Sequence, residues 1–193
     1  MFNFTGVIKR KSLHLYFFLL FAVIFLVGIG LGSVFASFVK GLSVKEFAEN
    51  VNYSMAHSGE NIREAVLSSA FSVYTLVLLL WCCGFCKKWL CIVIAAVVVT
   101  FKGVVTGYTT AMLIKAFGMH GVGIATVSIL PQYIILLPLV FFEATAAVIF
   151  SQMHFTKVKL KKYTVLLPVF LITGFICALA DGFGAGKLMA LFF

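Results

Sequence analysis

The chain has 193 residues, of which 63% are hydrophobic and only 11% are charged, and its formal net charge is +9. This composition argues against a soluble domain built around one buried core and is typical of an integral membrane protein. The length fits a single membrane domain over residues 1–193. The positive charge does not indicate nucleic-acid binding, because juxtamembrane turns and anionic lipid headgroups already account for a basic excess.

Apolar runs in this chain reach or approach the ~20 residues that a helix needs to cross a bilayer. Three basic residues, Lys9, Arg10 and Lys11, precede the first run. That run is too long for a signal-peptide core and lacks a convincing Ala-x-Ala cleavage site, so we expect it to be retained as a span. The sequence therefore predicts an all-α, polytopic membrane helix bundle with about five transmembrane helices, near residues 13–39, 65–85, 89–116, 122–151 and 163–180.

The basic residues predict the orientation of these spans. One side of the predicted membrane carries basic residues and no acidic ones, namely Lys9, Arg10, Lys11, Lys87, Lys88, Lys157, Lys159, Lys161 and Lys162. By the positive-inside rule this side is cytoplasmic, which also places the N-terminus in the cytoplasm. Residues 40–64 then form an external segment.

The external segment has the pattern of a short amphipathic helix. Ser43 and Glu46 have the spacing of a capping box. Apolar side chains recur after it at helical spacing, at Val44, Phe47, Ala48, Val51 and Met55. We expect this helix to lie on the outer membrane surface, where it either docks a partner or simply covers the outer face of the bundle.

Small residues recur every four positions in two of the predicted spans. The first stripe is Gly28, Gly32 and Ala36, and the second is Gly103, Gly107 and Ala111. Such stripes allow helix backbones to approach closely within a membrane. Both are therefore predicted to be helix-packing surfaces.

Two ionisable residues, Lys102 and Glu143, fall inside predicted spans, where an unpaired charge costs a few kcal/mol or more. The helical rise places Lys102 ~20 Å and Glu143 ~12 Å from the cytoplasmic ends of their spans. With extended side chains the two could meet, and we hypothesise that they form a pair. Thr106 and Gln132 are the polar neighbours expected to complete an intramembrane site.

Two prolines, Pro131 and Pro138, precede Glu143 in the fourth predicted span. Each removes a backbone hydrogen bond, so the helix is expected to kink or break. A broken helix is the form that transporters use at binding sites, whereas a kinked helix holding a paired charge needs no such function. A re-entrant stretch between the prolines also stays open.

No enzymatic constellation is found, so we expect neither catalysis nor a cofactor. Four cysteines cluster at one turn, but without a nearby histidine or a pair of Cys-x-x-Cys motifs they fit membrane-embedded small residues better than a metal site or a disulfide. They are Cys82, Cys83, Cys86 and Cys91. The four histidines, His14, His57, His120 and His154, are scattered over both membrane sides.

Several of these residues together resemble a known family. The run Phe101-Lys102-Gly103-Val104-Val105-Thr106-Gly107 is followed by Gly118, Gly121, Ser128-Ile129-Leu130-Pro131-Gln132-Tyr133 and Pro138, and later by Ala178-Leu179-Ala180-Asp181. This pattern resembles the stage II sporulation protein M family of bacterial integral membrane proteins. The resemblance is densest over residues 70–143.

The resemblance implies a bacterial cell-membrane protein with a role in endospore formation. It implies a non-enzymatic scaffold of the engulfment machinery that organises cell-wall hydrolases, the stage II sporulation proteins D and P, at the septal membrane. The residues themselves leave an alternative open, which is a transporter or permease subunit with an intramembrane site at Lys102, Gln132 and Glu143.

Overall fold

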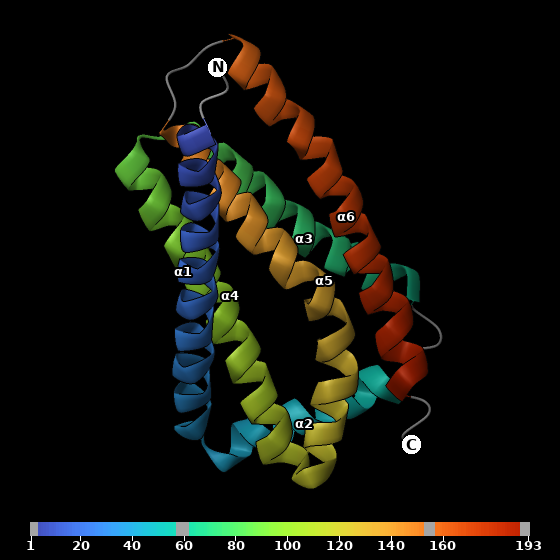
Figure 1. The fold of residues 1–193 in the computed structure, drawn as a ribbon. Coiled ribbons are helices and arrows are strands. Elements are labelled where there is room, and N and C mark those ends of the chain that lie inside the picture. The colour runs from blue at the N-terminus through green and yellow to red at the C-terminus, as the bar shows by residue number, and fades with distance from the viewer. Residues whose placement is uncertain (1–3, 57–61, 153–156, 190–193) are drawn as a thin grey trace.

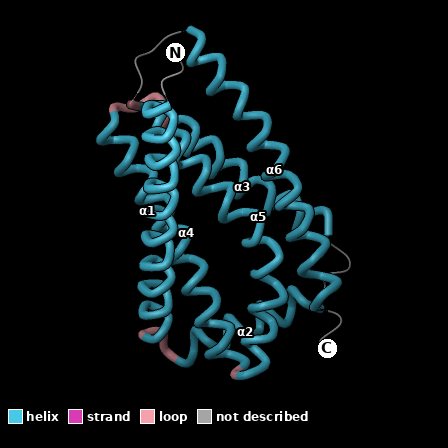
Figure 2. Tube along the Cα trace, in the orientation of Figure 1, coloured by secondary structure: helices cyan, strands magenta, loops and turns pink. Residues whose placement is uncertain are grey.

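The computed structural model describes residues 4–56, 62–152 and 157–189, and within these ranges the chain is helical with no strand (Figures 1 and 2). The helices are α1 (Phe4–Ser37), α2 (Gly41–Ala56), α3 (Ile62–Cys83), α4 (Lys88–Phe117), α5 (Met119–Ser151) and α6 (Lys157–Met189). The predicted all-α class is confirmed.

Four helical stretches are long and apolar enough to cross a membrane: His14–Ser37, Val66–Cys83, Lys88–Phe117 and Gln132–Ser151. They correspond to the first four predicted spans, and the fourth lies in α5, which is helical from Met119 to Ser151. The fifth prediction falls on Tyr163–Leu179, a shorter apolar part of α6. The helices therefore form a multi-pass membrane bundle.

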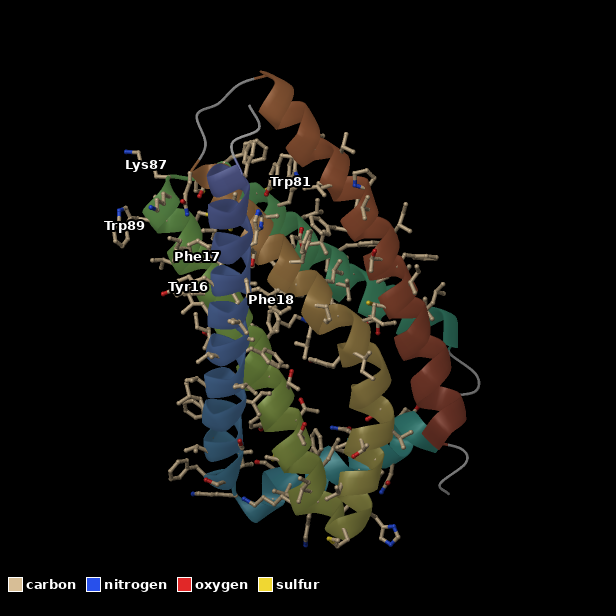
Figure 3. All side chains as sticks on the ribbon, viewed as in Figure 1. Tyr16, Phe17, Phe18, Trp81, Lys87 and Trp89 are labelled. Carbon is tan, nitrogen blue, oxygen red and sulfur yellow. The ribbon has the colours of Figure 1, made fainter. Side chains whose placement is uncertain are left out.

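The two ends of the bundle differ in what they carry. We call the end where α1, α4 and α6 begin the basic end, because Lys87 and Lys88 precede or open α4 there. Lys87 and Trp89 project outward at this end (Figure 3). The opposite end, where α1 and α4 finish and α2 crosses beneath the bundle, is called the α2 end (Figure 1).

Helix α5 is the central element of the bundle, since it packs against α1, α3, α4 and α6. In its membrane stretch 61% of residues are buried, compared with 28% to 33% in the other three spans. Its buried side chains include Leu136, Val140, Ala144 and Val148. Groups on the buried face of α5 are therefore shielded from lipid as well as from water.

Both Pro131 and Pro138 lie within α5, which stays helical from Met119 to Ser151 and bends along its length (Figure 2). Of the alternatives posed by the sequence, the structure shows the bent helix rather than a broken or re-entrant one. Neighbouring helices tolerate such prolines in membranes because they shield or satisfy the freed backbone groups. A third proline, Pro168, lies inside α6.

The two small-residue stripes pack against each other, and they bring the backbones of α1 and α4 into contact. A Cβ atom at Gly28 would lie 2.6 Å from the carbonyl oxygen of Thr100, and one at Gly103 would lie 2.5 Å from that of Phe25. Gly32 and Gly107 are equally close to the backbone of the opposite helix. Side chains at these positions would force the two helices apart, because a real Cβ atom does not approach a backbone atom this closely.

Replacement of Gly32 tests the contact between α1 and α4. In Gly32→Val the new side chain would collide with the backbone of Val104. We therefore expect the free energy of unfolding to fall by about 1–3 kcal/mol, the range for overpacking. Gly30→Val is the matched control, because beyond the adjoining backbone of α1 itself no atom lies within 4 Å of its Cβ position. Thermal unfolding followed by size-exclusion chromatography in detergent measures both; equal midpoints would contradict the close contact.

Candidate functional site

A set of polar side chains links α4 to α3 and α5 at membrane depth. The ammonium group of Lys102 donates to the hydroxyl of Ser72 on α3, with 3.4 Å between the two atoms. Thr106 lies 2.6 Å from the hydroxyl of Tyr133 on α5 and 2.8 Å from the carbonyl oxygen of Lys102. Because a hydroxyl carries one proton, Thr106 donates to that carbonyl and accepts from Tyr133. We call Ser72, Lys102, Thr106 and Tyr133 the polar layer.

The predicted pair of Lys102 and Glu143 is not formed. Neither carboxylate oxygen of Glu143 has a hydrogen-bond partner among the described residues, and Lys102 donates to Ser72 instead. Lys102 is 14 residues from the start of α4 and Glu143 is 8 residues from the end of α5, which offsets them by about 9 Å along the antiparallel helices. Because of this offset, the hydrogen-bond partner of Lys102 is the hydroxyl of Ser72 and not the carboxyl group of Glu143.

Glu143 is only 1% exposed and lies on the part of α5 that faces α3 and α6. Its neighbours in sequence fix this direction: Phe141 packs against Phe25 of α1, with ring centroids 5.8 Å apart, and Phe142 packs against Phe170 of α6. A further 100° turn of the helix takes residue 143 past α6 toward α3. The carboxyl group is accordingly close enough to Cys83 and Tyr163 to act electrostatically on both.

The remaining predicted site residues are placed in different surroundings. Gln132 is half-buried next to Tyr133 of the polar layer, whereas Pro138 is exposed on the bundle surface. Ala111 is half-buried one helical turn beyond Gly107. The structure thus separates the predicted site into the polar layer, which Gln132 adjoins, and Glu143, which lies apart.

An aromatic cluster at the basic end was not anticipated from the sequence. Tyr163 of α6 stacks on Phe150 of α5, with ring centroids 4.1 Å apart, and its hydroxyl donates to the carbonyl oxygen of Trp81 over 2.8 Å. The hydroxyl lies over Gly84, where no side chain intervenes. The only signal in the sequence was a set of aromatic residues near three span ends. This cluster holds together the ends of α3 and α5 and the apolar start of α6.

The neighbouring cysteines are free thiols: Cys83 and Cys91 are buried and Cys82 is exposed. Over the described ranges no group of three histidine, cysteine or acidic side chains has the geometry to hold a metal ion. His14 and His120 are exposed and belong to opposite ends of the bundle, while His57 and His154 lie outside the described residues.

At the α2 end, the amphipathic helix packs directly on the bundle. Phe47 and Val51 of α2 contact a small apolar cluster that comprises Leu113, Ile124 and Ala125. The helix begins at Gly41, so the prediction of Ser43 as its N-cap is wrong by a few residues; the chain resumes a helix as soon as it has turned away from α1. The face away from the bundle exposes Lys45, Glu46, Glu49, Asn50 and Asn52.

Lys115 fixes the same end of the bundle. Its ammonium group donates to the carbonyl oxygens of Ala36, Ser37 and Val39 at 3.4, 3.1 and 2.8 Å. These carbonyls follow the last turn of α1 or belong to it, where helix oxygens have no partner within the helix and favour a cation. Lys115 therefore ties the C-terminal end of α1 to α4, directly before the chain enters α2.

The polar layer predicts a difference between two threonines on α4. Thr106→Val removes the acceptor for Tyr133, whereas Thr109→Val removes only a bond to a carbonyl of its own helix. Interhelical hydrogen bonds in membranes contribute about 0.6 kcal/mol and up to about 1.7 kcal/mol. We therefore expect Thr106→Val to lower the free energy of unfolding by about that amount more than Thr109→Val. Equal stabilities in denaturant titrations would contradict the contact.

A family model described as Stage II sporulation protein M matches residues 21–183, which include the glycine contact, the polar layer and Glu143. No match is found among curated proteins or among solved structures. The chain therefore belongs to the stage II sporulation protein M family and is a sporulation-related, multi-pass membrane protein.

Proposed function

We propose that the chain is a non-enzymatic membrane scaffold of the engulfment machinery. In this role it would hold peptidoglycan hydrolases, the stage II sporulation proteins D and P, at the septal membrane. Its N-terminus and basic end would face the cytoplasm, in keeping with the positive-inside rule, and the α2 end would face the cell wall.

The observation that carries this proposal is the way α2 is held at its end of the bundle. Phe47 and Val51 anchor α2 to α4 and α5, and Lys115 fixes the chain just before it. The charged and amide side chains on the opposite face of α2 are left exposed. A surface helix that is fixed on one face and polar on the other presents a preformed surface, and preformed surfaces bind partners with a smaller ordering cost.

A second candidate function is that of a transporter or permease subunit, and the polar layer favours it. An ionisable group at membrane depth marks substrate or ion pathways in many membrane proteins. Lys102, Thr106 and Tyr133 would bring donors and acceptors to the contact of α4 with α5. In this version, function depends on the bundle interior rather than on α2.

Affinity purification of tagged full-length protein from gently solubilised membranes of sporulating cells distinguishes the two functions. We expect mass spectrometry to find the hydrolases with the wild type and with Lys102→Met. The double variant Glu46→Lys, Glu49→Lys reverses the charge on the outer face of α2, so hydrolase recovery should fall at least several-fold. Unchanged recovery with the double variant would contradict the scaffold, and an ATP-hydrolysing subunit as the main partner would favour transport.

Cysteine accessibility along residues 101–112 tests the second candidate directly. Single cysteines are introduced into a variant without native cysteines, and their reaction with a water-soluble maleimide is measured in membranes. A wet pathway gives labelling at every third or fourth position, on the face that carries Lys102 and Thr106. Uniform protection at the membrane centre would rule out the transporter version and leave the scaffold unaffected.

A further inference from the structure

Glu143 is the most unusual polar group in the described part of the bundle. Its side chain is 1% exposed, and neither of its oxygens has a hydrogen-bond partner within the described ranges. The helix that carries it is the most buried of the four spans. An ionised carboxylate in such a place would lose its hydration and gain no bond in return, which is strongly unfavourable.

The groups that face Glu143 do not supply a compensating charge. On α3 the titratable group that interacts electrostatically with Glu143 is Cys83, and on α6 it is Tyr163, whose hydroxyl proton is engaged with the carbonyl oxygen of Trp81. The aliphatic side chains of Val77 and Leu80 on α3 are fully buried in the same core. On α3 and α6 a carboxylate would therefore find a thiol and a phenol but no opposite charge.

The other two helices packed against α5 do not change this conclusion. Helix α4 contributes the buried thiol of Cys91 and also Lys102, which is offset from Glu143 by about 9 Å along the helix axis and donates to Ser72. Between Leu15 and Ser37, α1 has no charged residue, and its contacts with α5 are made by phenylalanines such as Phe18 and Phe25. The other titratable side chains of α5 itself are Tyr133, which belongs to the polar layer, and His120, which is exposed at the α2 end.

We propose that Glu143 is an intramembrane proton-binding site, in which the carboxyl group is kept as a neutral acid where α5 faces α3 and α6. Its ligand is a proton, and binding converts a carboxylate to a carboxylic acid without any other reactant. The neutral acid is compatible with apolar packing, whereas the anion is not. Release of the proton therefore requires α3 or α6 to move away from α5 so that water can enter.

This site links proton occupancy to the packing of three helices. It is independent of the scaffold proposed above, because it involves neither α2 nor any partner protein. It also differs from the hypothesised pair of Lys102 and Glu143, in which the carboxyl group would be ionised. The protonation state of Glu143 at neutral pH therefore distinguishes the proton-binding site from an ion pair with Lys102.

Infrared spectroscopy of the full-length protein in lipid vesicles measures that state, since a carboxylic acid and a carboxylate absorb at different frequencies. We expect the wild type at neutral pH to show a carboxylic-acid C=O band that is lost in Glu143→Gln. Glu46→Gln is the matched control: Glu46 is exposed on α2, so this change should remove carboxylate absorption and leave the acid band intact.

Glu143→Asp provides a second variant in case the amide disturbs folding, which size-exclusion chromatography would reveal. It should retain an acid band at a shifted frequency, because the shorter side chain occupies the same apolar surroundings. Raising the pH should convert the acid band to carboxylate in the wild type and change the infrared signal of the helices at the same time. If the wild type has no acid band at neutral pH, or if the wild-type band persists unshifted in folded Glu143→Gln or Glu143→Asp protein, the proposal is wrong.

Discussion

The contact between the backbones of α1 and α4 constrains the rest of the bundle. Gly28 and Gly103 lie so close to the opposite helix that the crossing point allows no side chain. With one face of α4 occupied by α1, the polar side chains Lys102 and Thr106 are directed to α3 and α5. In a membrane, where lipid is as apolar as the helices, such close van der Waals packing is a principal force that holds helices together.

The bundle accommodates polar groups in its interior in two ways. The polar layer provides partners: Lys102 meets Ser72, and Thr106 meets Tyr133. Glu143 is surrounded by hydrocarbon, a thiol and a phenol that is already engaged, so compatibility with its surroundings depends on its own proton. The first arrangement contributes to rigidity, because each partner fixes another helix. The second arrangement makes the packing of α5 against α3 and α6 depend on whether Glu143 carries its proton.

The two ends of the molecule complement this interior. At the basic end, Tyr163 joins α6 to Trp81 and Phe150, so that three helices are held at one aromatic cluster. At the other end, Lys115 donates hydrogen bonds to the carbonyl oxygens at the end of α1, and α2 is packed onto α4 and α5. A bundle secured at both ends is a suitable support for the exposed face of α2, which is where the proposed scaffold would meet its partners.

The sequence by itself determined the helical class, the positions of four spans, both glycine stripes and the family, because these depend on composition, local periodicity and short motifs. It also identified Lys102 and Glu143 as unusual, since membrane depth follows from distance along one helix. Only the tertiary structure decided that the glycine stripes meet each other, that Lys102 binds Ser72, and that Tyr163 reaches Trp81. Such contacts depend on the rotation and axial offset of one helix against another, which no single helix encodes.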